Sequence, residues 1–374
     1  MRDYLAVFGI AVVVTYLVGV AAREVATKVH AVARVRDRDV HAVPIPYFGG
    51  IAILAGLGAA YLLASRLPFL STSQDLVFHD TRAVLVGGAV ICAVGVIDDL
   101  VELDPLAKFA GQVVAAIVVV GMGVQFFYLP LPGEIVSLDP TQAVVFSVFV
   151  IVVTVNAVNF VDGLDGLAAG VVAIGAVAFF SFAYLLAAQN GQTRAIAAAL
   201  LTSALAGACA GFLPHNFFPA RMFMGDSGAM LIGLVLACSA ISLTGQFPAT
   251  SVTQGVGGAT ASLQPALLPL LLPIAMLVVP FLDLALAVIR RTRAGRSPFS
   301  PDLEHLHHRL LEIGHSHRRA VLVMYLLAAL VAFGTVVLSL SAGWRSYLVF
   351  GVLAVFTLGF AFWVPRWKRR AGTP

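Results

Sequence analysis

The chain has 374 residues, of which 60% are hydrophobic and only 11% are charged, and its formal net charge is +4. Soluble domains carry about a quarter charged residues, so this composition excludes an ordinary water-soluble enzyme. Cys92, Cys209 and Cys238 all lie inside apolar runs. We interpret them as small core residues that carry no information about the redox compartment.

Eleven uncharged runs are long enough to cross the roughly 30 Å of hydrocarbon in a bilayer. They predict an all-α polytopic membrane protein that forms a single domain over residues 1–374. The first run is interpreted as an uncleaved anchor, because only Arg2 and Asp3 flank it on the N-terminal side. In chain order the runs are 4–22, 48–65, 83–97, 109–129, 140–161, 166–188, 195–214, 227–246, 265–289, 320–340 and 346–364.

Lysine and arginine are unevenly distributed between the two sides of this predicted bundle. The segments that follow the odd-numbered runs, such as 23–47 and 290–319, hold most of the 23 basic residues. Because positively charged connections stay in the cytoplasm, the N-terminus is predicted outside and the C-terminus in the cytoplasm. The same side carries most of the carboxylates and histidines that are suited to chemistry.

The third run ends in GVIDDL, which places Asp98 and Asp99 at the cytoplasmic membrane face. Two adjacent carboxylates at a span boundary repel each other, which favours a bound cation or a raised pKa on one of them. A solvated helix end is the alternative. Lys108, near the start of the fourth run, is interpreted either as neutralising this pair or as holding a phosphate.

The segment NAVNFVDGLDGLAAG at 156–170 joins the fifth and sixth runs with almost no loop. Gly163 and Gly166 permit turns that bring backbone N–H groups against a ligand. Amides and carboxylates supply oxygen ligands suited to Mg²⁺ and partners for a nucleobase; a tight polar turn is the alternative. The side chains concerned are those of Asn156, Asn159, Asp162 and Asp165.

The eighth run is preceded by RMFMGDSG, with Asp226 immediately before the apolar residues. GDSG also occurs in chymotrypsin-like serine proteases, but nothing else in the chain supports that interpretation. Asp226 is interpreted as a helix N-cap, as a metal ligand, or as both, since one carboxylate can serve both roles.

The longest cytoplasmic connection contains PDLEHLHHRLL at 301–311 after a run of arginines. No cysteine and no H-E-x-x-H pattern accompany the histidines, so phosphate contacts and proton handling are favoured over a zinc site. The arginines are either positive-inside anchors or a fork for a diphosphate. The residues concerned are His305, His307, His308, Arg290, Arg291, Arg293 and Arg296.

Together, these motifs offer carboxylates for a divalent cation, amides and glycines for a nucleotide, and basic side chains for phosphates. This combination suits phosphoryl transfer, in which catalysis is mostly positioning and charge neutralisation. Its position at the bilayer edge implies that one substrate comes from water and the other from lipid.

The motifs, in this order and with VPIPYFGG at 43–50, resemble the polyprenyl-phosphate N-acetylhexosamine-1-phosphate transferase superfamily over nearly the whole chain. HLHHRLL is similar to the bacterial undecaprenyl-phosphate GlcNAc-1-phosphate transferase branch. The resemblance implies transfer of GlcNAc 1-phosphate from UDP-GlcNAc to a polyprenyl phosphate, with Mg²⁺ or Mn²⁺ as cofactor and UMP as second product. It further implies a bacterial plasma membrane enzyme, active at the cytoplasmic face, that initiates a cell-envelope polysaccharide. A homodimer is expected by resemblance alone, and no nucleic-acid partner is expected.

By the same resemblance, Asp98 and Asp99 match an acidic pair that either activates the lipid phosphate or belongs to the metal environment, and Lys108 matches a phosphate-binding lysine. Asn159 and Asp226 match positions that hold Mg²⁺. The catalytic set is completed by nucleotide-pocket and histidine-motif positions, which are Asp162, Asp165, His305, His307 and His308. The remaining substrate contacts are assigned to Asn156, Gly163, Arg290, Arg291 and Arg293.

Several alternatives stay open at this point. One alternative is that the donor is another UDP-HexNAc or UDP-MurNAc-pentapeptide, because no residue of the motifs identifies the sugar hydroxyls. DDLVE at 98–102 approaches the Asp-rich motif of intramembrane prenyltransferases, and cation transporters also carry intramembrane carboxylates. For the transferase, direct displacement with Asp98 accepting a proton is preferred over a two-step route through an aspartyl-phosphate.

Overall fold

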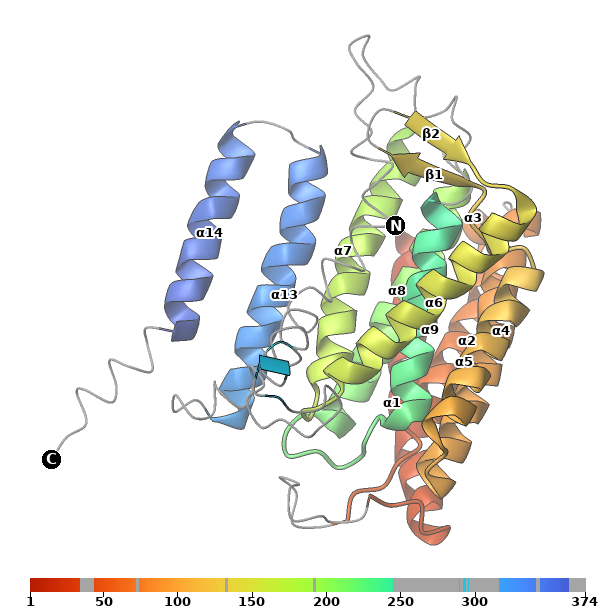
Figure 1. The fold of residues 1–374 in the computed structure, drawn as a ribbon, viewed down its shortest axis with the longest axis vertical. Helices are drawn as coiled ribbons and strands as arrows, with labels where there is room; N and C mark the ends of the chain where they lie inside the picture. The colour runs from red at the N-terminus through yellow and green to blue at the C-terminus, as the bar shows by residue number, and fades with distance from the viewer. Residues whose placement is uncertain are drawn as a thin grey trace, which may run out of the picture.

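The computed structural model describes residues 1–33, 44–71, 74–131, 134–190, 193–244, 289, 292–293, 295, 316–340 and 344–362. Within them the chain is a bundle of long helices with a two-stranded hairpin at one end (Figure 1). The helices are α1 (Arg2–Lys28), α2 (Gly49–Ala64), α3 (Pro68–Ser71), α4 (Gln74–Val101), α5 (Pro105–Gly121), α6 (Pro140–Val161), α7 (Leu167–Asn190), α8 (Thr193–Asn216), α9 (Gly225–Thr244), α13 (His317–Leu340) and α14 (Trp344–Phe362). The strands are β1 (Tyr128–Leu131) and β2 (Glu134–Ser137).

Most of the described helices are apolar enough to lie in a membrane. Seven also have the length that a span requires, namely α1, α4, α6, α7, α8, α9 and α13. Shorter apolar helices are formed by α2, α5 and part of α14. The prediction of a helical, polytopic membrane protein is therefore confirmed, while the predicted run 265–289 lies outside the described residues.

The predicted run 109–129 is wrong at its C-terminal end. α5 ends at Gly121, and beyond Gly123, which has a φ of +97°, the chain becomes extended. β1 and β2 then pair antiparallel, with Tyr128 opposite Ser137. Aromatic residues favour strands, and Pro130 lacks the N–H that a helix would need. A purely helical prediction therefore missed this small hairpin.

Two helices close to the predicted motifs begin at the same local signal, an aspartate followed by a proline. The Asp104 side chain accepts the N–H groups of the first turn of α5, and Asp139 does the same for α6, where Gln142 completes a capping box. Proline is tolerated at the first helical position because its missing N–H would have no partner there. These signals explain why α6 starts where the sequence predicts.

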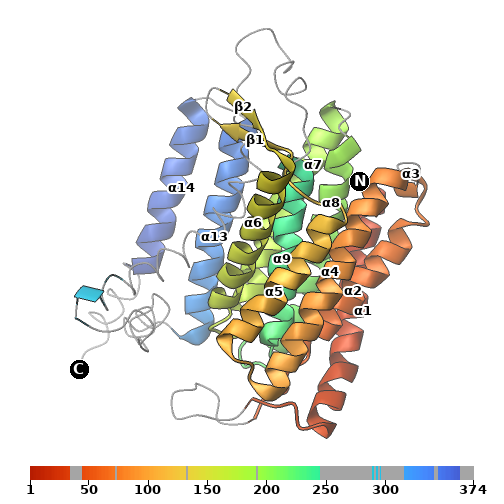
Figure 2. The same cartoon turned by 45° about the vertical axis from the view of Figure 1, so that its right-hand side comes forward.

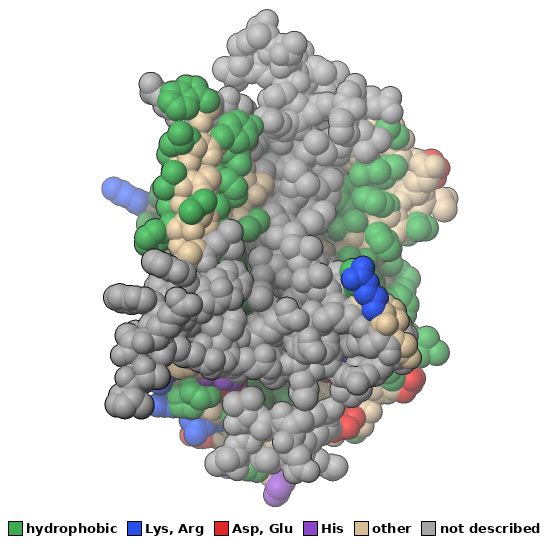
Figure 3. All heavy atoms as spheres, turned by 60° about the vertical axis from the view of Figure 1, so that its left-hand side comes forward, with side chains coloured by type: hydrophobic (Ala, Val, Ile, Leu, Met, Phe, Trp, Pro, Cys, Tyr) green, Lys and Arg blue, Asp and Glu red, His purple; other side chains and the backbone are tan. Residues whose placement is uncertain are grey.

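α8 and α9 form the buried centre of the bundle (Figures 1 and 2). α9 contacts α2, α4, α6 and α8, and its apolar side chains are buried on every face. Gly233 lets α9 approach α6 closely, since a Cβ there would lie 2.9 Å from the Cα of Val155. The outer helices instead expose large hydrophobic side chains, including Leu17, Val114 and Phe356, and hydrophobic atoms cover the described flanks (Figure 3).

The described connections that carry predicted motifs, those after α4, α6 and α8, meet at the end of the bundle opposite the hairpin (Figure 2). The N–H of Phe223 donates to Pro46 O at 2.9 Å and so joins the α8–α9 connection to the α1–α2 connection. Arg318, in the first turn of α13, donates its Nε–H to Phe218 O at 3.0 Å. Segments that are far apart in the sequence are therefore assembled around one site.

Candidate active site

A pocket of about 690 Å³ lies at this end, between the connections that follow α1 and α4. Four carboxylates line it: Asp98 and Asp99 near the end of α4, Glu102 just after it, and Asp226 at the start of α9. The rest of the lining comes from residues 30–33 and 100–103 together with Tyr47 and Phe223. So acidic a pocket suits a phosphate compound only if cations accompany it.

Asp99 closes the N-terminal end of α9 from the neighbouring helix α4. Its Oδ1 accepts the N–H of Asp226 at 2.8 Å, and its Oδ2 accepts the N–H of Ser227 at 3.3 Å. The first N–H groups of a helix lack partners within the helix and attract negative charge. α9 begins at Gly225, so Asp226 lies in the first turn, and the interpretation of Asp226 as the N-cap is wrong.

Gly225 is required by this arrangement for two reasons. Its φ is +67°, a conformation that side chains other than glycine rarely adopt. A Cβ at this position would also overlap the carboxylate of Asp99. The glycine of the GDSG segment therefore allows the carboxylate to reach the start of α9.

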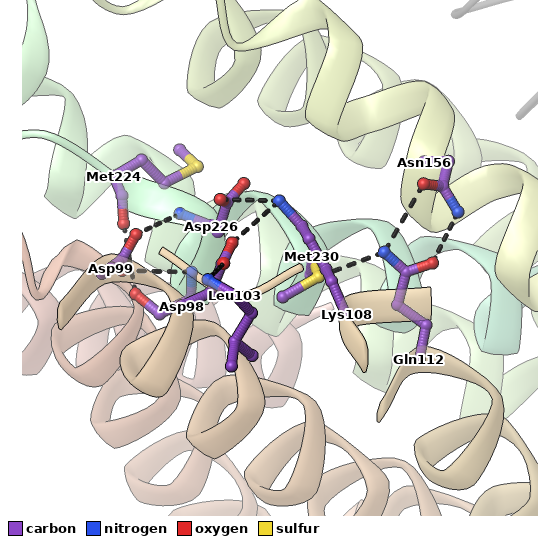
Figure 4. Close-up of polar contacts among 10 residues, drawn as sticks. Asp98, Asp99, Leu103, Lys108, Gln112, Asn156, Met224, Asp226 and Met230 are labelled. Carbon is purple, nitrogen blue, oxygen red and sulfur yellow. Dashed lines mark hydrogen bonds and ion pairs between the residues drawn. The ribbon is translucent and has the colours of Figure 1, made fainter. Parts of the chain in front are cut away.

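Lys108 on α5 joins Asp98 and Asp226, two of the other three carboxylates of the pocket (Figure 4). Its Nζ lies 3.0 Å from Asp98 Oδ2 and 2.6 Å from Asp226 Oδ2. Asp98 also accepts the N–H of Leu103 at 2.8 Å. The sequence predicted that Lys108 neutralises Asp98 and Asp99, but the structure has Asp226 in place of Asp99. One ammonium between two carboxylates offsets their mutual repulsion.

Asp162, the C-cap of α6, lies within reach of the same charges. Burial of its carboxyl group, followed by the negative charges of Asp226, Asp99 and Asp165, raises the pKa of Asp162 to about 7. Like charges raise the pKa of a carboxyl group only when they lie nearby. The carboxylates of Asp226 and Asp99 thus act electrostatically on the turn after α6.

The glycine-rich turn after α6 is held by hydrogen bonds from three directions. Gly166 has a φ of +78° and donates its N–H to Asn216 Oδ1 at 3.0 Å. Its carbonyl accepts the hydroxyl of Tyr325 on α13. Asp165 Oδ2 accepts the N–H of Ala220 at 3.0 Å. Asp165 thus holds the turn against the α8–α9 connection and does not contact Lys108.

Asn156, predicted to bind substrate, is already engaged by the protein. Its Nδ2 donates to Gln112 Oε1 at 2.6 Å and to Val152 O at 2.8 Å. Gln112 in turn donates from Nε2 to Met230 Sδ at 3.4 Å. The structure therefore places the Asn156 amide between α5 and α6, one turn before the end of α6.

The structure brings some of the predicted residues together and leaves others untested. Asp98, Asp99, Lys108 and Asp226 are linked by direct contacts. Asn159 lies in the last turn of α6 and Gly163 in the turn that follows. Arg293 is described and exposed. Outside the described residues lie His305, His307, His308, Arg290, Arg291 and Arg296.

Sequence reasoning missed three residues that hold the site in place, namely Gln112, Asn216 and Tyr325. Each has a polar side chain in an apolar run or at its end. A polar group inside a span is costly unless it has a partner, so such residues were a usable signal. The sequence does not reveal the partners, because they lie on other helices.

The donor groups of the pocket fit a magnesium ion better than a transition metal. Among the described residues, no cluster of three His, Cys, Asp or Glu side chains is arranged to hold a metal ion. Mg²⁺ does not require one, since it binds through one or two carboxylates together with phosphate oxygens and water. Asp226, half-buried at the pocket wall, is suited to such a role.

The model of glycosyl transferase family 4 matches residues 81–244 of the chain. This range includes the aspartates of α4, Lys108, the turn after α6 and Asp226. The match therefore covers every residue of the ion-pair cluster formed by Asp98, Lys108 and Asp226.

Individual proteins are similar over most of the chain. The decaprenyl-phosphate N-acetylglucosaminephosphotransferase of Mycobacterium tuberculosis is 46% identical over 328 residues, which are 87% of this chain and 80% of that protein. A probable undecaprenyl-phosphate N-acetylglucosaminyl 1-phosphate transferase of Bacillus subtilis is 32% identical over 338 residues, 89% of this chain and 84% of the relative. The undecaprenyl-phosphate alpha-N-acetylglucosaminyl 1-phosphate transferase of Salmonella typhi is 28% identical over 320 residues, with 83% and 77% covered.

Proposed function

The chain belongs to glycosyl transferase family 4, and from this premise we infer that it transfers N-acetylglucosamine 1-phosphate to a polyprenyl phosphate. Relatives with up to 46% identity over most of the chain are named for this transfer. We propose UDP-GlcNAc as the donor, so that the products are polyprenyl-diphosphate-GlcNAc and UMP. The product would initiate a cell-envelope polysaccharide.

The observation that carries the reaction class is the ion-pair cluster where α4 and α9 meet. The ammonium of Lys108 lies 3.0 Å from a carboxylate oxygen of Asp98 and 2.6 Å from one of Asp226, at the ends of membrane helices. Phosphoryl transfer needs opposed charges that neutralise a diphosphate and a group that takes up a proton. At a helix end, a lipid phosphate reaches the cluster from the bilayer and a nucleotide sugar reaches it from water.

We propose a direct displacement at the phosphorus that carries the sugar. Asp98 accepts the proton of the polyprenyl phosphate, and an oxygen of that phosphate forms the new phosphoanhydride bond while the bond to UMP breaks. Lys108, between Asp98 and Asp226, is placed to bind the phosphate oxygens on which negative charge accumulates. Mg²⁺, for which we propose Asp226 and Asn159 as ligands and Mn²⁺ as a substitute, supplies further charge neutralisation when bound.

The nucleotide is proposed to bind beside the turn after α6. Positive φ at Gly166 and the fixed carbonyl and N–H groups of the turn support this assignment, and Gly163 leaves room for a ligand against the backbone. Asp162 and Asp165 are proposed to orient the nucleotide. The histidine motif at 305–308 and the arginines at 290–293 are proposed to contact the diphosphate on the basis of the sequence resemblance.

The topology that we propose has eleven spans, with the N-terminus outside and the C-terminus in the cytoplasm of a bacterium. Seven described helices have the length and composition of spans, and three more are shorter and apolar; the eleventh is predicted from the sequence of 265–289. The basic connections then lie in the cytoplasm, and the active site opens there. A homodimer is proposed from the family resemblance alone.

The transfer is tested with membranes that contain the chain, Mg²⁺, polyprenyl phosphate and one labelled UDP-sugar at a time. UDP-GlcNAc should give solvent-extractable label, and Asp226→Asn should remove nearly all of it. Asp139→Asn is the matched control, because Asp139 is also an aspartate at the start of a helix but caps α6 at the hairpin end. Absence of lipid-linked label with every UDP-sugar would contradict the proposed reaction. Label from a different UDP-sugar, and none from UDP-GlcNAc, would show that this other sugar nucleotide is the donor.

Two further measurements test the mechanism. One phosphoanhydride is exchanged for another, so the reaction should run backwards, and labelled UMP with the lipid-linked product should yield labelled UDP-GlcNAc. UMP should appear only when the lipid acceptor is present. Stoichiometric UMP release from UDP-GlcNAc without acceptor would favour the two-step route through an aspartyl-phosphate.

A further inference from the structure

A second polar layer lies inside the bundle, one helical turn from the ion-pair cluster. It consists of Gln112 on α5, Asn156 on α6 and Met230 on α9. Gln112 is only 2% exposed. Its Oε1 accepts the Asn156 Nδ2–H at 2.6 Å, and its Nε2 lies 3.5 Å from Asn156 Oδ1 and 3.4 Å from Met230 Sδ. Both ends of the Gln112 amide are therefore in use.

This layer uses the same helices as the site. Gln112 follows Lys108 by four residues on α5, and Met230 follows Asp226 by four residues on α9. Residues four apart lie on the same helix face, one above the other. In Figure 4 the side chain of Lys108 accordingly lies between the carboxylates on one side and the Gln112–Asn156 pair on the other. On α6, Asn156 lies three residues before Asn159.

We propose that Gln112 and Asn156 are positioning residues. They fix the position of α5 relative to α6 and α9, and thereby the position of the Lys108 ammonium. The proposal rests on the proposed function, and it reassigns Asn156 from a substrate contact to a support of the site. Lys108 bridges two carboxylates from different helices, at 3.0 and 2.6 Å. A small translation or rotation of α5 would therefore change which carboxylate the Lys108 ammonium contacts and how that ammonium binds a phosphate.

An amide pair is suited to this task in a way that apolar side chains are not. Two primary amides that face each other have one register in which donors meet acceptors, and any slip in an apolar interior leaves them unsatisfied. Apolar residues pack almost equally well in neighbouring registers. In the part of the chain that the structure describes, α5 packs mainly against α4 and α6, and the pair restricts how α5 slides along them.

The test separates positioning from mere stability by removing one amide or both. Asn156→Leu leaves the buried amide of Gln112 without its partner, which lowers heat stability. Gln112→Met should lower it less, because the half-buried Asn156 keeps its hydrogen bond to Val152 O. The double variant removes both amides, and stability should return toward that of the wild type. If the pair positions Lys108, the kcat of the double variant stays about 10- to 100-fold below that of the wild type, because misplacing a catalytic group by about 1 Å slows a reaction by this order. The KM for the UDP-sugar should change less than kcat.

Rescue and control variants complete the experiment. Exchanging the two amides (Gln112→Asn together with Asn156→Gln) keeps the total side-chain length and should restore most of kcat. Val119→Ala, which opens space on a buried face of α5 farther from the site, should lower heat stability without a comparable loss of kcat. A double variant with wild-type kcat, or a Val119→Ala enzyme that loses kcat equally, would overturn the proposal. Wild-type membranes that transfer no label would instead contradict the proposed function.

Discussion

Asp99 serves the site in two ways that different substitutions separate. Its oxygens accept two N–H groups at the start of α9, and its charge adds to the acidic pocket. Asparagine keeps one of the two acceptor oxygens but has no charge. Asp99→Asn should therefore lose most of the transferase activity while losing less stability than Asp99→Ala. Asp99→Ala should also lower the free energy of unfolding, by about 1 kcal/mol.

Both properties are measurable on purified protein in detergent, by lipid-linked label and by thermal unfolding. Asp139→Ala provides the comparison, because it removes a helix cap at the far end and should lower stability without removing activity. Full activity of Asp99→Asn would exclude its charge from the chemistry. Equal stability of the two Asp99 variants would exclude the cap.

Gly225 is the residue whose conformation the site depends on most directly. Gly225→Ala places a Cβ at a φ of +67° and against Asp99, so we expect a loss of roughly 1–2 kcal/mol from the backbone conformation alone. Displacement of Asp99 should also abolish transfer. Gly58→Ala is the matched control, because its Cβ meets nothing within 4 Å in the middle of α2 and alanine favours helices. An active, stable Gly225→Ala enzyme would contradict the described start of α9.

At the scale of elements, α13 supports the turn proposed to bind the nucleotide. Tyr325 donates its hydroxyl to the carbonyl of Gly166, and its ring fills the space beside Gly170. Tyr325→Phe keeps the ring and removes only the hydrogen bond. We expect the KM for UDP-GlcNAc to rise several-fold with a smaller change in kcat, since one lost hydrogen bond costs about 1 kcal/mol.

Initial rates over a range of UDP-GlcNAc concentrations give both constants. Tyr347→Phe is the control, because Tyr347 is exposed on α14 and loses the same hydroxyl. Unchanged kinetics of Tyr325→Phe would show that the turn keeps its shape without α13. A fall in kcat with an unchanged KM would assign Tyr325 to the chemistry itself.

The sequence predicted elements well where a local signal marked them. The run 140–161 coincides with α6 because Asp139 and Pro140 start it and the polar turn ends it. The run 109–129 failed at the hairpin because apolar composition alone does not distinguish a helix from an apolar strand. The motif residues were recognisable individually, but the pairing of Asp99 with the start of α9 spans 127 positions. No periodicity or spacing reports a contact of that kind.

At the scale of the whole molecule, the bundle has apolar flanks suited to a membrane and one charged end that contains the candidate active site. The described flanks are covered by hydrophobic side chains, and charged and histidine side chains gather at the lower end in Figure 3. That end contains Lys108, the acidic pocket and the start of α13. The excess of lysine and arginine in the connections there predicts that it faces the cytoplasm.

Sidedness is measurable with one introduced cysteine at each end. Ser316→Cys lies at the site end and Ser137→Cys in the hairpin, and both serines are exposed. The native cysteines Cys92, Cys209 and Cys238 are buried, so they should contribute little background. In intact cells a membrane-impermeant maleimide should label Ser137→Cys alone, and Ser316→Cys should become labelled only after the membrane is opened. The reverse pattern would invert the topology, and the nucleotide sugar would then have to arrive from outside the cell.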